Sequence, residues 1–102
     1  MPRLAHHVYF TLHDRGDEAK QNLLNACKNY LTEHPGLVGF DVGVRERDLD
    51  RPVNGDFDVS LHTIFDSREN HDLYQTAERH LRFIEENKDN WAAVQVFDSV
   101  LD

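Results

Sequence analysis

Four short segments of this chain alternate between apolar and other residues, the pattern of strands that bury one face. The first covers residues 6–13, HHVYFTLH, with mainly apolar residues at the even positions. The others cover residues 37–45, 57–65 and 91–101. We therefore predict four strands, each with one face suited to a core and one mixed face.

Two segments between these strands have helical spacing. In residues 18–33 the apolar positions recur every three or four residues, at Leu23, Leu24, Cys27, Tyr30 and Leu31. Residues 66–87 begin at Asp66 and Ser67, which are good helix caps. The predicted buried side of this second segment carries Leu73, Ala77, Leu81 and Ile84.

The order of the elements is strand, helix, strand, strand, helix, strand. This βαββαβ order is that of the ferredoxin-like α+β fold, a four-stranded antiparallel sheet with both helices on one face. With 102 residues, the chain fits a single domain over residues 1–102. A charged loop at residues 46–56 joins the second and third strands, and we expect it to fold over an opening.

The predicted sheet face that is turned away from the helices mixes aromatic, small and hydrogen-bonding side chains. Such a composition lies between that of a solvated face and that of a core, and suits a contact between subunits. We therefore predict a homodimer in which two sheets pack face to face, through a surface that includes His7, Tyr9, Asp41, Ser60 and His62.

Composition excludes several kinds of partner. The formal net charge is −8 without a basic cluster, which disfavours binding to nucleic acid or to anionic membranes. No apolar run approaches the roughly 18 residues of a membrane span, and the first residues do not resemble a signal peptide. We expect a cytoplasmic protein, in which Cys27 is a buried thiol.

Five segments together resemble the stress-responsive A/B barrel (Dabb) domain family of the dimeric α+β barrel superfamily. They are AHHVYFTL, HPGLVGFDVG, GDFDVSLHTIFDS, YQTAERHLRFIEE and WAAVQVFDS, and they span nearly the whole chain. The resemblance implies ferredoxin-like protomers that dimerise through their sheets into a dimeric α+β barrel. Fold alone does not fix chemistry, and many such domains have no assigned activity.

The chain also resembles a plant polyketide cyclase of this superfamily, which closes a linear chain by an intramolecular aldol step without a cofactor. This resemblance implies that His80 is the base, Tyr74 the oxyanion donor and His6 a second polar contact. It also implies a pocket between sheet and helices, lined by Val8, Phe10, Val38, Phe40, Phe83, Trp91, Val94 and Val96.

Helix geometry makes the pairing of Tyr74 and His80 conditional. On an unbroken helix, residues six apart point about 120° away from each other, so the two rings would not converge. Relatives often carry proline where this chain has Glu78, which would break the helix. Here we expect Thr76 to cap a new helix, with Glu78 in its first turn.

Simpler interpretations remain open at this point. Tyr74 and His80 can bury their rings in the core and bond to the backbone or to His6. Three functions are therefore left open by the sequence. The chain is a binding protein for a small apolar ligand, a cyclase-like enzyme, or a structural dimer without ligand.

A metal site also deserves consideration, because His7 and His62 share a predicted sheet face with Asp41 and Asp58. No compact metal-binding motif supports it, so we predict neither a metal nor a cofactor. We expect the remaining histidines His13, His34 and His71 to be solvated.

Overall fold

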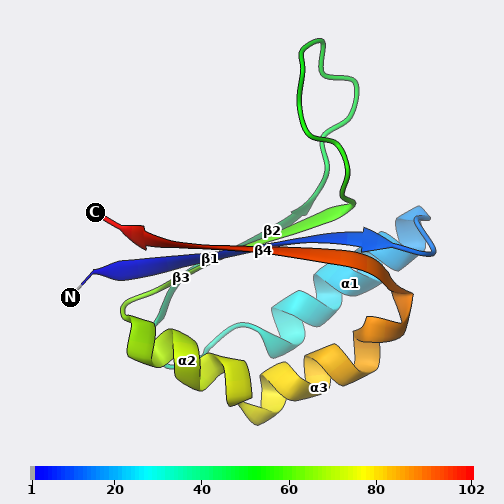
Figure 1. The fold of residues 1–102 in the computed structure, drawn as a ribbon. Coiled ribbons are helices and arrows are strands. Elements are labelled where there is room, and N and C mark those ends of the chain that lie inside the picture. Colours follow the sequence, from blue (N-terminus) through cyan, green and yellow to red (C-terminus); the bar gives the residue numbers. More distant parts are fainter. Residues whose placement is uncertain (1) are drawn as a thin grey trace.

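The computed structural model of the protein describes residues 2–102, which form a four-stranded antiparallel sheet with helices on one face (Figure 1). The strand order across the sheet is β2-β3-β1-β4. In chain order the elements are β1 (Arg3–Leu12), α1 (Asp17–Tyr30), β2 (Leu37–Val44), β3 (Val59–Phe65), α2 (Arg68–Thr76), α3 (Glu78–Asn87), a 3₁₀ turn (Lys88–Asn90) and β4 (Trp91–Leu101). The predicted ferredoxin-like fold is confirmed.

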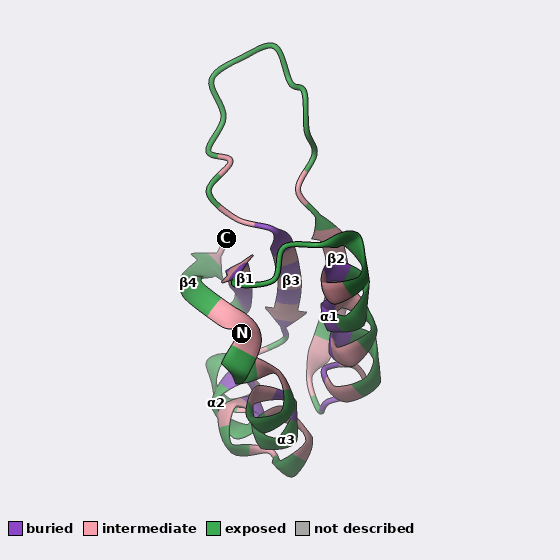
Figure 2. Ribbon diagram, turned by 90° about the vertical axis from the view of Figure 1, so that its right-hand side faces the viewer, coloured by how far each residue is buried: buried purple, intermediate pink, exposed green. Residues whose placement is uncertain are grey.

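The core lies between the sheet and the helices, where alternate strand residues meet the inner sides of the helices (Figure 2). Its buried residues are Val8, Phe10, Leu12, Leu23, Cys27, Leu31, Val59, Leu61, Phe65, Tyr74 and Phe83. Burial raises the pKa of the Cys27 thiol to about 12, so this thiol is an inert core group, as expected. One sheet face is thus used by the core, and the other is left for different contacts.

β2 departs from the predicted alternation because its pairing with β3 is irregular between Leu37 and Gly39. Val38 falls at this irregularity, and its side chain is 60% exposed rather than directed into the core. Beyond it, the alternation resumes and Phe40 packs against the core cluster.

β3 begins two residues later than predicted, because Asp58 is held in place before the strand starts. Its carboxylate lies 3.0 Å from Arg15 Nε and accepts a hydrogen bond from a backbone N–H of β1 at 2.8 Å. The alternation suggested that Phe57 extends the core face, and the structure shows that it does not. Its ring lies 5.0 Å from that of Tyr9, on the face turned away from the helices.

The loop between β2 and β3, residues 45–58, projects from the sheet on the side opposite the helices (Figure 1). Asn54 and Phe57 border a hollow of about 470 Å³ on that face. The loop therefore stands beside this opening and does not cover the space between sheet and helices. Leu49 and Val53 in the loop are exposed apolar residues.

The second predicted helix is two helices that are separated at Ala77. The hydroxyl of Ser67 accepts a hydrogen bond from the N–H of Asn70 and caps α2, as expected. The backbone then becomes extended at Ala77, with φ −62° and ψ 140°, and α3 starts at Glu78. The prediction that Thr76 caps α3 is wrong, because Thr76 ends α2 and its hydroxyl donates to a carbonyl of the preceding turn.

The buried sides of these helices also differ from the prediction. Leu73 and Leu81 are 57% and 51% exposed, although their spacing suggested that they are buried. Instead α2 buries His71 and Tyr74, and α3 buries Phe83. Because α3 starts afresh after an extended residue, its inner face does not continue the helical phase of α2.

We expect Glu78→Pro to change the free energy of unfolding by less than about 1 kcal/mol, because proline is favoured at the first position of a helix. Ala77 already has the extended conformation that a following proline requires. Urea denaturation measures the change. Arg82→Pro is the matched control, since both variants remove the exposed Glu78–Arg82 ion pair. Proline inside α3 should cost about 3 kcal/mol or more, and equal losses for the two variants would contradict the break at Ala77.

Candidate functional site

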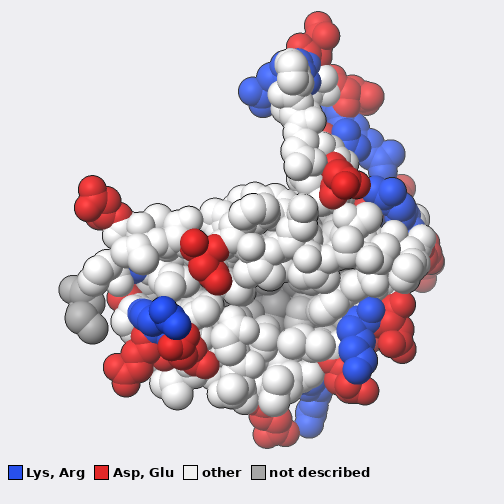
Figure 3. All heavy atoms as spheres, viewed as in Figure 1, with Lys and Arg blue, Asp and Glu red and all other residues white. Residues whose placement is uncertain are grey.

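A cavity of about 290 Å³ lies between the sheet and the helices. Figure 3 shows its opening as a hollow below the edge of the sheet, bordered mainly by uncharged residues. The cavity opens beside β4, an edge strand that leaves much of its surface exposed. On its sheet side, where β1 forms the floor and β4 the mouth, facing residues form one polar pair and two apolar pairs: His6 with Asp98, Val8 with Val96, and Phe10 with Val94.

The polar pair joins a buried imidazole to a carboxylate that water reaches. His6 Nδ1 lies 2.5 Å from Asp98 Oδ1, a short charge-assisted hydrogen bond. The Asp98 side chain is 46% exposed. Burial lowers the pKa of His6 below its usual value, by more than the bond to Asp98 raises it.

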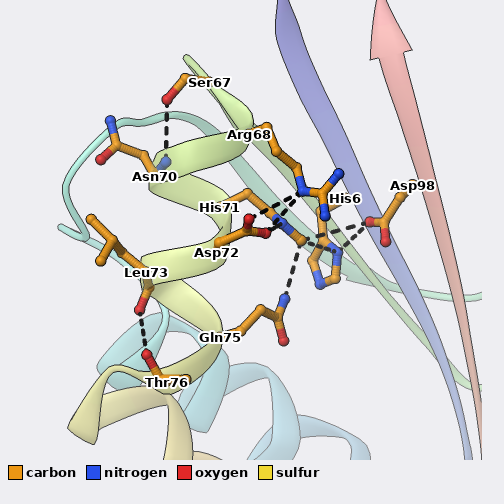
Figure 4. A network of polar contacts seen from close by, with 10 residues as sticks. All are labelled: His6, Ser67, Arg68, Asn70, His71, Asp72, Leu73, Gln75, Thr76 and Asp98. Carbon is orange, nitrogen blue, oxygen red and sulfur yellow. Dashed lines mark hydrogen bonds and ion pairs between the residues drawn. The ribbon is translucent and has the colours of Figure 1, made fainter.

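His71 approaches this pair from α2 (Figure 4). Its Nε2 atom is 3.3 Å from His6 Nδ1 and 3.9 Å from Asp98 Oδ1. Gln75 Nε2 lies 3.1 Å from the same His71 nitrogen, and Asp72 Oδ1 lies 3.1 Å from His71 Nδ1. Side chains from β1, β4 and α2 thus form one polar cluster on the cavity wall.

Tyr74 and His80 come together across the helix break. Their ring centroids are 4.4 Å apart with planes inclined at 45°, and the Tyr74 ring lies 6.1 Å from that of His6. All three side chains line the cavity. The structure therefore brings together the three residues that the family resemblance selects.

The end of α2 orients His80. The last carbonyls of a helix lack helical partners, and the Gln75 carbonyl oxygen lies 3.2 Å from His80 Nδ1. Donation of the Nδ1 proton to this carbonyl assigns the tautomer and leaves Nε2 with a free lone pair. Burial lowers the pKa of His80, by more than the bond to Gln75 raises it, so the ring is neutral near pH 7.

The hydroxyl of Tyr74 is buried and has no hydrogen-bond partner within residues 2–102. Burial also raises the pKa of Tyr74 above its usual value, so the phenol stays protonated at neutral pH. An unpaired buried hydroxyl costs about 1–3 kcal/mol. A bound molecule that offers an oxygen acceptor would recover part of this cost.

The apolar wall contains most of the side chains that the resemblance assigns to it: Val8, Phe10, Phe83, Trp91, Val94 and Val96. The rings of Phe10 and Trp91 lie 4.9 Å apart, and those of Phe83 and Trp91 5.6 Å. Val38 and Phe40 lie elsewhere, because β2 is at the edge of the sheet opposite to β4. Val38 is exposed and Phe40 packs in the core.

Sequence reasoning missed His71, and the expectation that His34 and His71 are solvated is wrong for both. They are 7% and 8% exposed, whereas His13 is exposed as expected. The signal was present, since His71 stands three residues before Tyr74 and must share its helix face. His34 packs its ring edge-on against Tyr74, at 4.9 Å.

Asp98 was also missed, although the alternation in β4 places it on the same face as Val94 and Val96. A carboxylate that continues an apolar row is an informative exception, because a charged group beside a core needs a polar or charged partner. Here that partner is His6, directly opposite in the β1–β4 ladder.

The face turned away from the helices carries an aromatic group. The rings of His7 and His62 stack at 4.3 Å with planes 12° apart, and Tyr9 lies 5.8 Å from Phe97. Asp58 is not with these histidines, because Arg15 and the β1 backbone hold its carboxylate. The metal site considered from the sequence would need His7, His62, Asp41 and Asp58 to come together. The structure does not bring these four residues together.

Fold and cavity together define a ferredoxin-like α+β protomer with a site between its sheet and its helices that opens beside β4. The chain belongs to the stress responsive A/B barrel domain (Dabb) family, whose model matches residues 4–101. The resemblance seen in the sequence motifs is thereby confirmed. No curated protein matches the chain.

Several solved structures share the fold. A hydroxynitrile lyase from Passiflora edulis superposes with a TM-score of 0.82 at 12% identity, covering 98% of this chain and 94% of that one. A dimeric ferredoxin-like protein of unknown function from Thermobifida fusca gives 0.81 at 17% identity, with coverages of 98% and 92%. A Dabb family protein from Mesorhizobium loti gives 0.79 at 19% identity, with coverages of 98% and 97%. At these identities the likeness concerns the fold alone.

Proposed function

We propose that this protein binds a small, largely apolar molecule in the cavity between its sheet and its helices. The supporting observation is the cavity itself, which has a volume of about 290 Å³ and a mainly apolar lining to which His6, Tyr74 and His80 add polar atoms. Ligand sites usually measure roughly 300–1,000 Å³, and a cavity of about 150 Å³ already holds benzene. A ligand of one substituted ring, or a short chain with one or two oxygens, matches this size.

A second candidate function is proton transfer without a cofactor, and the neutral His80 beside Tyr74 favours it. In a cyclase-like reaction, His80 Nε2 removes a proton from a carbon between two carbonyls. The enolate carbon then attacks another carbonyl of the same molecule, and the proton passes to the new alkoxide. Tyr74 donates to the enolate oxygen and His6 offers a second polar contact. Because one neighbour is a hydroxynitrile lyase, hydroxynitriles belong among the test substrates.

The protein is proposed to act as a homodimer that packs two sheets face to face, through a surface that includes His7, Tyr9, Asp41, Ser60 and His62. Two observations support this arrangement. Phe97 is 55% exposed on that face, and the exposed Leu49 and Val53 stand on a loop that projects beyond it (Figure 1). Solved neighbours, among them the Thermobifida fusca protein, are described as dimeric.

Location and partners beyond the dimer stay predictions. Within the described residues, no helix has the length and apolar character needed to cross a membrane. A cytoplasmic location, the absence of a nucleic-acid partner and the absence of a cofactor in the proposed proton transfer are inferred from composition and motifs, and fractionation of cells would test the first.

Val96→Trp should abolish ligand binding, because Val96 is half exposed at the mouth of the cavity and a larger side chain there closes it. A panel of small aromatic and β-dicarbonyl compounds is expected to raise the Tm of the wild type. Stabilisation is about 2.7 kcal/mol at a ligand concentration of 100 times Kd. Val100→Trp, on the same face of β4 but outside this cavity, should keep the shift. If no compound raises the Tm of either the wild type or Val100→Trp, the result favours a structural dimer without ligand.

His80→Gln should lower kcat for any substrate that the wild type converts by about 10²–10⁴-fold, because it removes the base. The ligand-induced rise in Tm should remain, since the cavity keeps its shape. The active form has neutral His80, whose pKa in the folded protein lies below the ordinary value of about 6.5. The wild-type kcat/KM should therefore be constant near neutral pH and fall only as the pH drops below that lowered pKa. Unchanged turnover in His80→Gln would contradict this role.

Phe97→Asp should dissociate the dimer, because it would bury a charge between the two sheets. Size-exclusion chromatography with light scattering at micromolar concentration measures the mass. Leu73→Asp is the control, since Leu73 is equally exposed but lies on α2, in the helix layer. A monomeric wild type, or an intact Phe97→Asp dimer, would rule out the sheet-to-sheet interface.

A further inference from the structure

Three side chains with metal-binding atoms converge at the polar end of the cavity floor: His6 from β1, His71 from α2 and Asp98 from β4 (Figure 4). We propose that they bind a divalent transition-metal ion of the Zn²⁺ type. This inference goes beyond the proposed ligand binding and does not use Tyr74 or His80.

The distances between the ligand atoms suit one shared ion. His6 Nδ1 lies 2.5 Å from Asp98 Oδ1 and 3.3 Å from His71 Nε2, and the third separation, between His71 Nε2 and Asp98 Oδ1, is 3.9 Å. Atoms that bind one tetrahedral Zn²⁺ at its usual bond lengths are about 3.3 Å apart. The observed separations lie on both sides of this value, so small side-chain rotations bring all three atoms into bonding range.

The donor set is one that such ions prefer. Two imidazole nitrogens and one carboxylate oxygen are found in zinc sites that keep an open position, and the same set holds non-haem iron. With three protein ligands, the ion retains a coordination position. His6, His71 and Asp98 all line the cavity, so that position would face a molecule bound there.

An outer carboxylate orients His71 as in many metal sites. Asp72 Oδ1 lies 3.1 Å from His71 Nδ1, and Arg68 Nε holds the same carboxylate oxygen at 3.0 Å. Metal-binding histidines usually donate their second ring N–H to such a group, which fixes the tautomer. Donation from Nδ1 leaves the lone pair of His71 Nε2 for the ion.

Burial and access also fit. The side chains of His6 and His71 are 7% and 10% exposed, so both imidazoles are largely buried. Asp98 is half exposed on the edge strand, so an ion can reach the site from solvent at this side. The Gln75 amide nitrogen, 3.1 Å from His71 Nε2, donates to the lone pair that the ion would use, so this amide turns away when the ion binds.

Chelator-treated, tag-free protein titrated with Zn²⁺ by calorimetry, and with Co²⁺ by visible absorption, tests the proposal. We expect one ion per chain with micromolar or tighter Kd, ligand-field bands from Co²⁺, and no binding of Mg²⁺, which prefers oxygen ligands. Asp72→Asn should weaken Zn²⁺ binding by about 10–100-fold, the usual effect of losing an outer partner. Asp98→Asn should weaken it further, because it removes a direct ligand.

His62→Gln distinguishes this site from the stacked pair of His7 and His62 on the other sheet face. Binding that persists in Asp98→Asn and is lost in His62→Gln overturns the proposal, as does a wild type that binds neither Zn²⁺ nor Co²⁺. Asp98 is on the surface, so its variant should fold, and circular dichroism confirms this before titration. The outcome is separate from ligand binding, which Val96→Trp tests without touching a metal ligand.

Discussion

The extended backbone at Ala77 is the constraint on which the candidate site depends. It ends α2 so that a carbonyl of the last turn, that of Gln75, becomes available to orient His80. It also resets the helical phase, so that His80 lies 4.4 Å from Tyr74 instead of on another side of one long helix. Within residues 2–102, no side chain caps the start of α3 at this break. Arg79, in the first turn of α3, instead donates hydrogen bonds to the carbonyl oxygens of Asn29 and Thr32 around the end of α1, which helps to fix where α3 begins.

The period of two along each strand divides the chemistry between the two faces of the sheet. On β1, His6, Val8 and Phe10 face the helices and the cavity, while His7 and Tyr9 face the other way. The proposed ligand and the proposed second copy would therefore use opposite faces of the sheet, without competition between them. A register slip of one residue would exchange the two sets, so the pairing of β1 with β3 and β4 is a functional constraint as well as a structural one.

Sequence alone predicted the fold and the strand faces well, because alternation and element order are local properties. It placed the start of β3 too early, since the capture of Asp58 by Arg15 involves residues far apart in the chain. The family resemblance placed Val38 in the pocket, and the alternation agreed because a pairing irregularity leaves no mark in a run of alternating residues. Sequence reasoning missed the contact of His71 with Asp98, which depends on how α2 lies over β1 and β4. This contact is tertiary. Helix spacing predicts which face of α2 carries His71, and strand alternation predicts which face of β4 carries Asp98, but neither predicts that the two faces meet.

Burial has the same consequence for His6 and His80, whichever chemistry they serve. It lowers the pKa of His6 and His80, and only a neutral imidazole offers the lone pair that a base or a metal ligand needs. The two rings differ in their hydrogen-bond partners. The oriented nitrogen of His80 bonds to a neutral carbonyl, which leaves Nε2 beside Tyr74. His6 instead faces a carboxylate and a second imidazole, an arrangement in which one cation satisfies three acceptors at once. The two proposals therefore assign the cavity a group for moving a proton and, a few ångströms away, a group of ligands for holding a positive charge.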